Sequence, residues 1–220
     1  MSYYEYNGYE RPNFWNSLPV VTRNIIAINV LMFIATLVNQ NFMIGNFAMF
    51  YPASPYFRIW QPLTHMFMHG GFWHIFFNMY TFFFFGTMLE RTLGSKKFLW
   101  FYFITGFGAV ALHMLVQWLQ VRAGVNVAAI YQTPVLGASG AVYGVLIGYA
   151  MLFPNDRMTL LFPPVTLKAK WMMLIFAGIE LVTGAVGTAD GVAHFAHLGG
   201  MLFGAILIIW WRKTGRLSRW

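Results

Sequence analysis

The chain has 220 residues, of which 59% are hydrophobic and only 9% charged, and its mean hydropathy is +0.58. Soluble domains carry about 25% charged residues, so the composition excludes an ordinary soluble domain and indicates a membrane protein. Cysteine is absent, which excludes disulfides and thiolate metal sites.

Six apolar stretches approach the roughly 20 residues that a membrane-spanning helix needs. They lie near 21–40, 73–93, 98–119, 139–153, 170–187 and 192–211. We therefore expect an all-α polytopic membrane protein with six transmembrane helices in one domain over 21–213. A short cytoplasmic segment (1–20) without a signal-peptide pattern would precede it, and a basic cytoplasmic tail (214–220) would follow.

The net charge of +8 at pH 7 is distributed by membrane side. Twelve of the 14 lysines and arginines lie before or at the start of the first stretch, in or at the edge of every second loop after it, or behind the sixth stretch, and only Arg58 and Arg122 lie on the other side. The positive-inside rule then predicts that both termini lie in the cytoplasm. Because the charge reports topology, it does not indicate a nucleic-acid partner.

The segment between the first and second stretches is aromatic but broken by Pro52, Pro55, Pro62 and a Gly-Gly pair. It is too interrupted to span a bilayer and too apolar for a solvated loop. We expect this first outer loop to lie in the membrane interface.

The fourth stretch is short. From Ser139 to the stop at Pro154 a helix would be about 22 Å long, against a hydrocarbon core of roughly 30 Å. With its other end at the cytoplasmic surface, Ser139 would lie below the outer surface. Irregular backbone at that depth requires a protein-lined, wet pocket that opens to the outer side.

Small residues flank both a serine and a histidine. Gly137 and Gly140 surround Ser139, and Gly200 follows His197 by one turn. Such residues let two membrane helices approach closely, which would bring Ser139 and His197 together. A serine hydroxyl is a weak nucleophile until a neighbouring base takes its proton, so the pair predicts a catalytic Ser–His dyad.

His74 and Asn78 are one turn apart at the outer end of the second stretch, at the expected level of Ser139. Together with the backbone N–H of Ser139, they are candidate donors to an oxyanion. Tyr143, one turn after Ser139, could pack on the His197 ring or be an ordinary packing residue.

No acidic partner for His197 is evident, which favours a dyad without a third member. Glu180 lies inside the fifth stretch, where a carboxylate is a functional candidate by default, but the sequence does not assign its role. His65 and His69 have metal-ligand spacing without a carboxylate nearby, which favours packing, so we expect no metal and no cofactor. A transporter using His65, His69, His74 and Glu180 is an open alternative.

Four motifs together resemble the rhomboid family of intramembrane serine proteases. They are HIFFN with His74 and Asn78, ERTLGSKKF with Glu90, GASGAVYG with Ser139 and Tyr143, and AHLGGMLFG with His197, Gly200 and Gly204. In the first outer loop the chain departs from the Trp-Arg pair of many relatives, since it has Trp60-Gln61. An arginine contribution to loop stability is therefore not expected.

The resemblance implies the bacterial six-helix form, a bundle in the cell (inner) membrane in which Ser139 is the nucleophile and His197 the base. His74, Asn78 and the Ser139 N–H would form the oxyanion hole. The substrates would be transmembrane segments of other membrane proteins, cleaved in the bilayer without cofactors. The gate would be roughly 170–192, which makes Glu180 a gate candidate. An inactive rhomboid-like scaffold is the second alternative.

Overall fold

A computed structural model of the chain describes residues 14–160, 163–187 and 193–217. Most of the expected N-terminal segment 1–20, the last three residues of the expected tail and residues 188–192 of the expected gate lie outside the described residues.

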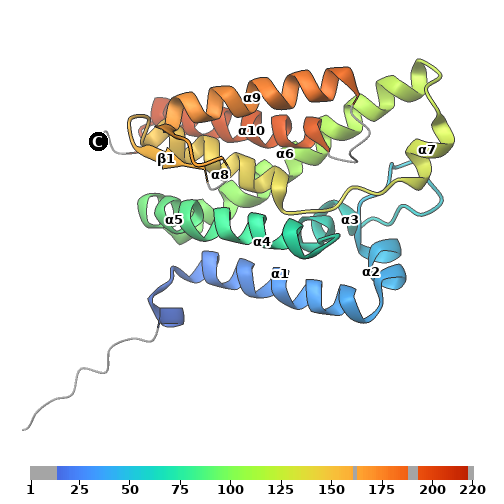
Figure 1. Cartoon of the computed structure of the whole chain (residues 1–220), viewed down its shortest axis with the longest axis horizontal. Coiled ribbons are helices and arrows are strands. Elements are labelled where there is room, and N and C mark those ends of the chain that lie inside the picture. Colours follow the sequence, from blue (N-terminus) through green and yellow to red (C-terminus); the bar gives the residue numbers. More distant parts are fainter. Residues whose placement is uncertain (1–13, 161–162, 188–192, 218–220) are drawn as a thin grey trace, which may run out of the picture.

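Helices dominate the fold and most run along a common direction (Figure 1). The first half contains η1 (Phe14–Ser17), α1 (Val20–Val38), α2 (Gln40–Phe47), α3 (Gln61–Thr64), η2 (His65–Phe67), α4 (Phe72–Thr81), the π-helical turn η3 (Phe82–Gly86) and α5 (Thr87–Leu93). The second half contains α6 (Ser95–Arg122), α7 (Val127–Gln132), α8 (Ser139–Leu152), α9 (Ala169–Val186) and α10 (His194–Lys213). The start of α1 and the end of α10 lie at the same end of the bundle.

Four helices of the described residues, α1, α6, α9 and α10, are long and apolar enough to cross a membrane. The expected second span is built from three consecutive pieces, α4, η3 and α5, and the backbone keeps α-helical angles at Phe82 and Thr87 where the pieces meet. As expected, α8 is short, with 14 residues. Figure 1 shows that it begins part-way along the bundle.

A short β-hairpin between α8 and α9 departs from the all-α expectation. Strands β1 (Arg157–Thr159) and β2 (Thr166–Lys168) pair antiparallel, with Met158 opposite Leu167. Three-residue strands leave too little alternation for a sequence pattern to detect.

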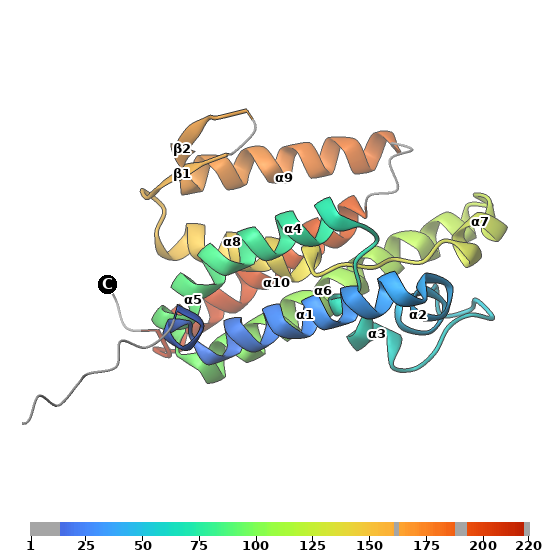
Figure 2. The ribbon, with the colours of Figure 1, turned by 60° about the horizontal axis from the view of Figure 1, so that its bottom comes forward.

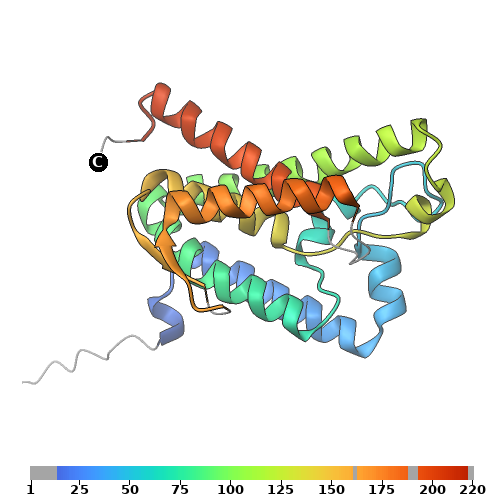
Figure 3. The same ribbon diagram turned by 45° about the horizontal axis from the view of Figure 1, so that its top comes forward.

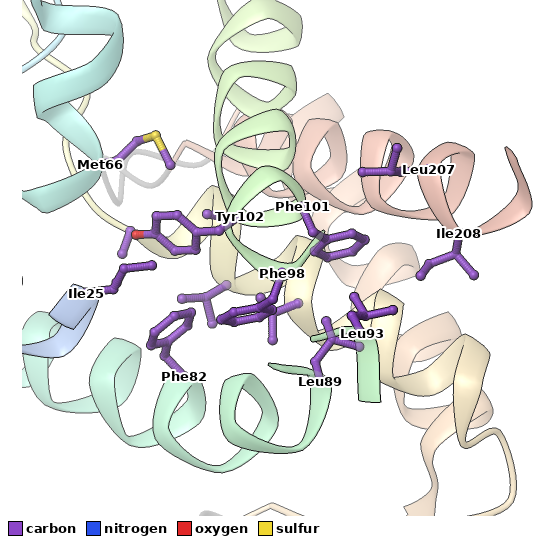
Figure 4. Close-up of a cluster of buried hydrophobic side chains, with 14 of the residues drawn as sticks. Ile25, Met66, Phe82, Leu89, Leu93, Phe98, Phe101, Tyr102, Leu207 and Ile208 are labelled. Atoms are coloured by element: carbon purple, nitrogen blue, oxygen red, sulfur yellow. The ribbon is translucent and has the colours of Figure 1, made fainter. Parts of the chain in front are cut away.

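The core is formed by large apolar side chains at the centre of the bundle (Figure 4). Phe82, Phe98 and Tyr102 are fully buried, and the Phe82 ring contacts the other two, with centroids 5.9 Å from Phe98 and 5.3 Å from Tyr102. These contacts join the second expected span to α6 and fix the middle of the bundle.

The carboxylate of Glu90 holds the start of α1. It accepts hydrogen bonds from the backbone N–H groups of Val21 and Thr22, at 3.0 and 2.7 Å, and from the hydroxyls of Thr22 and Ser95. A negative group at a helix N-terminus satisfies donors that the helix cannot pair itself. This accounts structurally for the acidic residue of the ERTLGSKKF motif.

Gln61 holds the first outer loop together. Its side chain is fully buried, donates to the carbonyl of Tyr56 at 3.0 Å and accepts from the N–H of Phe50 at 3.3 Å. The neighbouring Trp60 ring N–H donates to the carbonyl of Asn46 at 2.9 Å. A neutral amide thus ties the loop at the second position of the Trp60-Gln61 pair.

The same loop is bound to the chain segment that leads into α8. Met49 and Val135 exchange two backbone hydrogen bonds of 2.8 Å, and the N–H of Gly137 donates to the carbonyl of His65 at 3.0 Å. The loop therefore fixes the position of the residues just before Ser139.

Candidate active site

The two helices that carry Ser139 and His197 are packed backbone to backbone. A Cβ atom added to Gly200 would overlap the carbonyl oxygen of Gly140, and one added to Gly204 would lie 3.0 Å from the carbonyl oxygen of Gly144. Only glycine allows this approach. It brings the first turns of α8 and α10 side by side.

Ser139 and His197 meet at this level, with the hydroxyl oxygen of Ser139 2.9 Å from Nε2 of His197. The Tyr143 ring stacks on the His197 ring, with centroids 4.3 Å apart and planes inclined by 12°. His197 is buried, and Ser139 is half-buried. The hydroxyl can therefore donate its proton to a ring whose orientation is fixed.

A cavity of about 990 Å³ adjoins the pair. Its lining includes Ser139, His197, His74 and Asn78. Gly137 borders it in a left-handed conformation with φ +130°, and a Cβ there would lie 2.8 Å from Nε2 of His74 and 3.5 Å from Oγ of Ser139. The space between the His74 ring and the Ser139 hydroxyl is thus kept open by a glycine.

Asn78 is oriented by its own helix. Its side-chain amide donates to the carbonyl of His74 at 2.8 Å, which fixes the amide nitrogen one turn from the His74 ring. Both side chains face the cavity into which the hydroxyl of Ser139 opens. Their assignment as oxyanion donors remains a prediction.

Glu180 lies beside His197, a contact that the sequence did not predict. Its Oε1 is 2.9 Å from Nδ1 of His197 and accepts a 2.7 Å hydrogen bond from the Tyr143 hydroxyl, while Oε2 is 2.6 Å from Nδ1 of His194. Spacing could not reveal this contact, because it depends on which face of α9 turns toward α10.

Among the residues that the structure describes, Glu180, His194 and His197 form a cluster whose side chains could hold a metal ion. His65 and His69 are not part of it. Nδ1 of His65 pairs with the carbonyl of Gln61 at 3.0 Å, and the ring of His69 packs edge-on against His74. These contacts are those of packing histidines.

The transporter alternative requires one polar path through His65, His69, His74 and Glu180. Of these four, His65 and His74 line the cavity, whereas His69 and Glu180 do not. Two further polar residues that the sequence did not single out for chemistry, His113 and Gln117 of α6, also line it.

The cavity continues between α4 and α9. Its lining includes Trp73, Phe77 and Tyr80 of α4, and Met172 and Phe176 of α9. Figures 2 and 3 show α9 close to α10 at one end and diverging from it toward the β-hairpin. An elongated apolar segment could therefore reach Ser139 from the side.

Comparisons with known proteins agree on one family. Residues 56–213 match the family model described as the rhomboid domain. The chain is 34% identical over 150 residues to RHOMBOID-like protein 1 of Arabidopsis thaliana, a match that covers 68% of this chain and 34% of that protein.

Two bacterial relatives carry the name rhomboid protease. Identity is 28% over 159 residues to AarA of Providencia stuartii, covering 68% of this chain and 55% of the relative. It is 26% over 196 residues to GlpG of Yersinia pseudotuberculosis, covering 86% and 62%. The matched region thus spans less than two thirds of each of these relatives.

The family domain covers most of the chain, including Ser139, His197, His74 and Asn78. The chain is therefore a multi-pass membrane protein that belongs to the rhomboid family, which includes intramembrane serine proteases.

Proposed function

We propose that the protein is an intramembrane serine endopeptidase in which Ser139 is the nucleophile and His197 the base. The observation that carries the proposal is the 2.9 Å separation between the Ser139 hydroxyl and Nε2 of His197, beside a cavity large enough for a peptide segment. Membership in a family that includes serine proteases supports it.

In this mechanism the Ser139 oxygen attacks the carbonyl carbon of the scissile bond while its proton moves to Nε2 of His197. His197 then gives that proton to the departing amine, and the acyl group remains on Ser139. Water, deprotonated in turn by His197, releases the acyl group and restores the serine.

His74, Asn78 and the backbone N–H of Ser139 would stabilise the oxyanion of the tetrahedral intermediate. Ser139 is the first residue of α8, so its N–H belongs to the group of helix N-terminal donors without a carbonyl partner in the helix. The open space that Gly137 leaves beside His74 provides room for the oxyanion.

The substrates would be transmembrane segments of other membrane proteins. The proposal includes six spanning helices, of which the α4–η3–α5 series is one and the short α8 another. Both termini would lie in the cytoplasm, and the cavity would open to the outer side. Entry between α4 and α9 is consistent with the apolar lining there. The chemistry needs no metal, cofactor or nucleic acid.

Reaction with a fluorophosphonate probe tests the proposal, because the probe traps an activated serine. We expect labelling of the purified protein at Ser139 and none in Ser139→Ala or His197→Ala, with parallel loss of cleavage of a fluorogenic transmembrane peptide. Peptide binding without labelling or cleavage would instead identify a rhomboid-like scaffold.

A further inference from the structure

We propose that Glu180 is a positioning residue that completes a Ser139–His197–Glu180 relay. In this arrangement its carboxylate holds His197 in the orientation and tautomer that accept the serine proton. The inference rests on the proposed function of Ser139 and His197, and it adds a third member to a pair that the sequence favours as a dyad.

The first argument is the placement of the two partners around one imidazole ring. Nε2 of His197 is 2.9 Å from the Ser139 hydroxyl, and Nδ1 is 2.9 Å from Oε1 of Glu180. The second contact is close but bent, since Nδ1 has no aligned hydrogen-bond acceptor. Catalytic hydrogen bonds are often poorly aligned without substrate and tighten when it binds.

The second argument is that the carboxylate is itself held in place. The Tyr143 hydroxyl of α8 donates to Oε1 at 2.7 Å, and Nδ1 of His194 in α10 is 2.6 Å from Oε2. Tyr143 also stacks on His197, so one residue fixes both the ring and the carboxylate. Glu180 therefore joins three helices at a single point.

The third argument is the cost of this residue in a spanning helix. Glu180 is 6% exposed, whereas its neighbours Leu181 and Val182 are 56% and 61% exposed on the outer face of α9. A carboxylate in a membrane helix is expensive and is retained where it faces polar partners inside the bundle. Its inward direction is thus set by His197, His194 and Tyr143.

The protonation follows from these contacts. A neutral imidazole carries one N–H, and a carboxylate can only accept, so the proton lies on Nδ1. The lone pair on Nε2 then faces the Ser139 hydroxyl. When the serine proton moves to Nε2, the imidazolium is stabilised by the adjacent carboxylate, which does not take the proton.

A divalent cation is the competing occupant of this cluster, because Glu180, His194 and His197 offer ligand atoms within 4.8 Å of one another. A cation on Nδ1 of His197 would displace its proton and remove the Glu180 contact. We favour the relay because both carboxylate oxygens already have protein partners. The cation is tested as an alternative outcome below.

The test compares Glu180→Gln, which keeps the shape and removes the charge, with Leu31→Ala, a control at an exposed position of α1 that lies outside the expected gate. We expect Glu180→Gln to lower kcat and the fluorophosphonate labelling rate at least roughly tenfold with little change in KM; the equivalent change in a serine-protease triad costs about 10⁴. Leu31→Ala should label at the wild-type rate.

Equal labelling of wild type and Glu180→Gln would overturn the relay. So would labelling that rises when EDTA is added to wild type but not to Glu180→Gln, since that result identifies an inhibitory cation site. A wild-type protein without labelling at Ser139 contradicts the proposed function itself, which separates the two failures.

If the Glu180 variant fails to fold, a measurement on the unaltered chain still tests the relay. Imidazole ¹⁵N chemical shifts of histidine-labelled protein, assigned by their loss in His197→Ala, report the tautomer. We expect the proton on Nδ1 of His197, with a strongly hydrogen-bonded downfield resonance. A proton on Nε2 contradicts the relay.

Discussion

Single glycines decide the geometry around Ser139. Gly137 combines a left-handed backbone, φ +130°, with a position between the His74 ring and the Ser139 hydroxyl. Any L-residue there is strained and also fills the space that an oxyanion needs. The site therefore depends on the open space beside Gly137 as well as on the side chains that react.

Gly137→Ala tests this point. Its methyl would lie 2.8 Å from Nε2 of His74, so we expect cleavage to fall by roughly 10²-fold or more, the usual cost of disturbing an oxyanion hole. The measurement is kcat/KM on a transmembrane peptide. Gly45→Ala, where nothing lies within 4 Å, is the control; comparable activity of both variants would refute the role of this space.

His65 provides a pH-dependent contribution to stability. Burial lowers the pKa of His65 to about 4, and its Nδ1–H pairs with the carbonyl of Gln61. In the unfolded chain, His65 binds a proton below about pH 6.5. In the native chain, His65 stays neutral until the pH falls to about 4. The native state therefore loses stability as the pH falls from about 6.5 to about 4.

We expect the unfolding free energy to decrease by up to about 1.4 kcal/mol per pH unit between pH 6 and 4 from this residue alone. Denaturant unfolding in detergent at several pH values measures the slope. His65→Gln should show a shallower slope than the wild type. Identical slopes would mean that His65 does not carry this dependence.

At the scale of elements, the spacing of apolar and small residues and the positions of helix-breaking prolines predict much of the fold. The short α8 follows from Ser139 and Pro154, and the close approach of α8 and α10 follows from glycines four residues apart. The β-hairpin was missed because its strands are too short to show a period. The Glu180 contact was missed because the helical face of α9 is set by tertiary packing.

Gly200→Ala tests the contact between α8 and α10. The new methyl would overlap the backbone carbonyl of Gly140, and no side-chain rotation can relieve a backbone clash. We expect the helices to separate, with a stability loss of about 1–3 kcal/mol and a larger loss of activity, because Ser139 and His197 move apart.

Thermal unfolding and fluorophosphonate labelling, measured together, distinguish the two effects. Gly178→Ala in α9, where nothing lies within 4 Å, should retain both stability and labelling. Normal labelling of Gly200→Ala would show that the serine and histidine meet without this close approach.

At the scale of the whole molecule, the distribution of charge along the bundle predicts an orientation in the membrane that can be tested. The start of α1 and the end of α10 share one end of the bundle, and α2, α3 and α7 lie at the other (Figure 1). Among the described residues, the lysines and arginines lie toward the first end, except Arg58 and Arg122, which lie toward the second. If the positive-inside rule holds, the second end faces the exterior, and α8 begins with Ser139 part-way along the bundle on the side toward that end.

Because the chain contains no cysteine, single introduced cysteines report this orientation without background. Val125 lies between α6 and α7, Thr214 follows α10, and both are exposed. With a membrane-impermeant maleimide on intact spheroplasts, we expect Val125→Cys to be labelled at once and Thr214→Cys only after permeabilisation. The unaltered chain should remain unlabelled throughout. The reverse order would invert the topology and place the opening of the Ser139 cavity toward the cytoplasm, so that substrates would have to be cut near their inner ends.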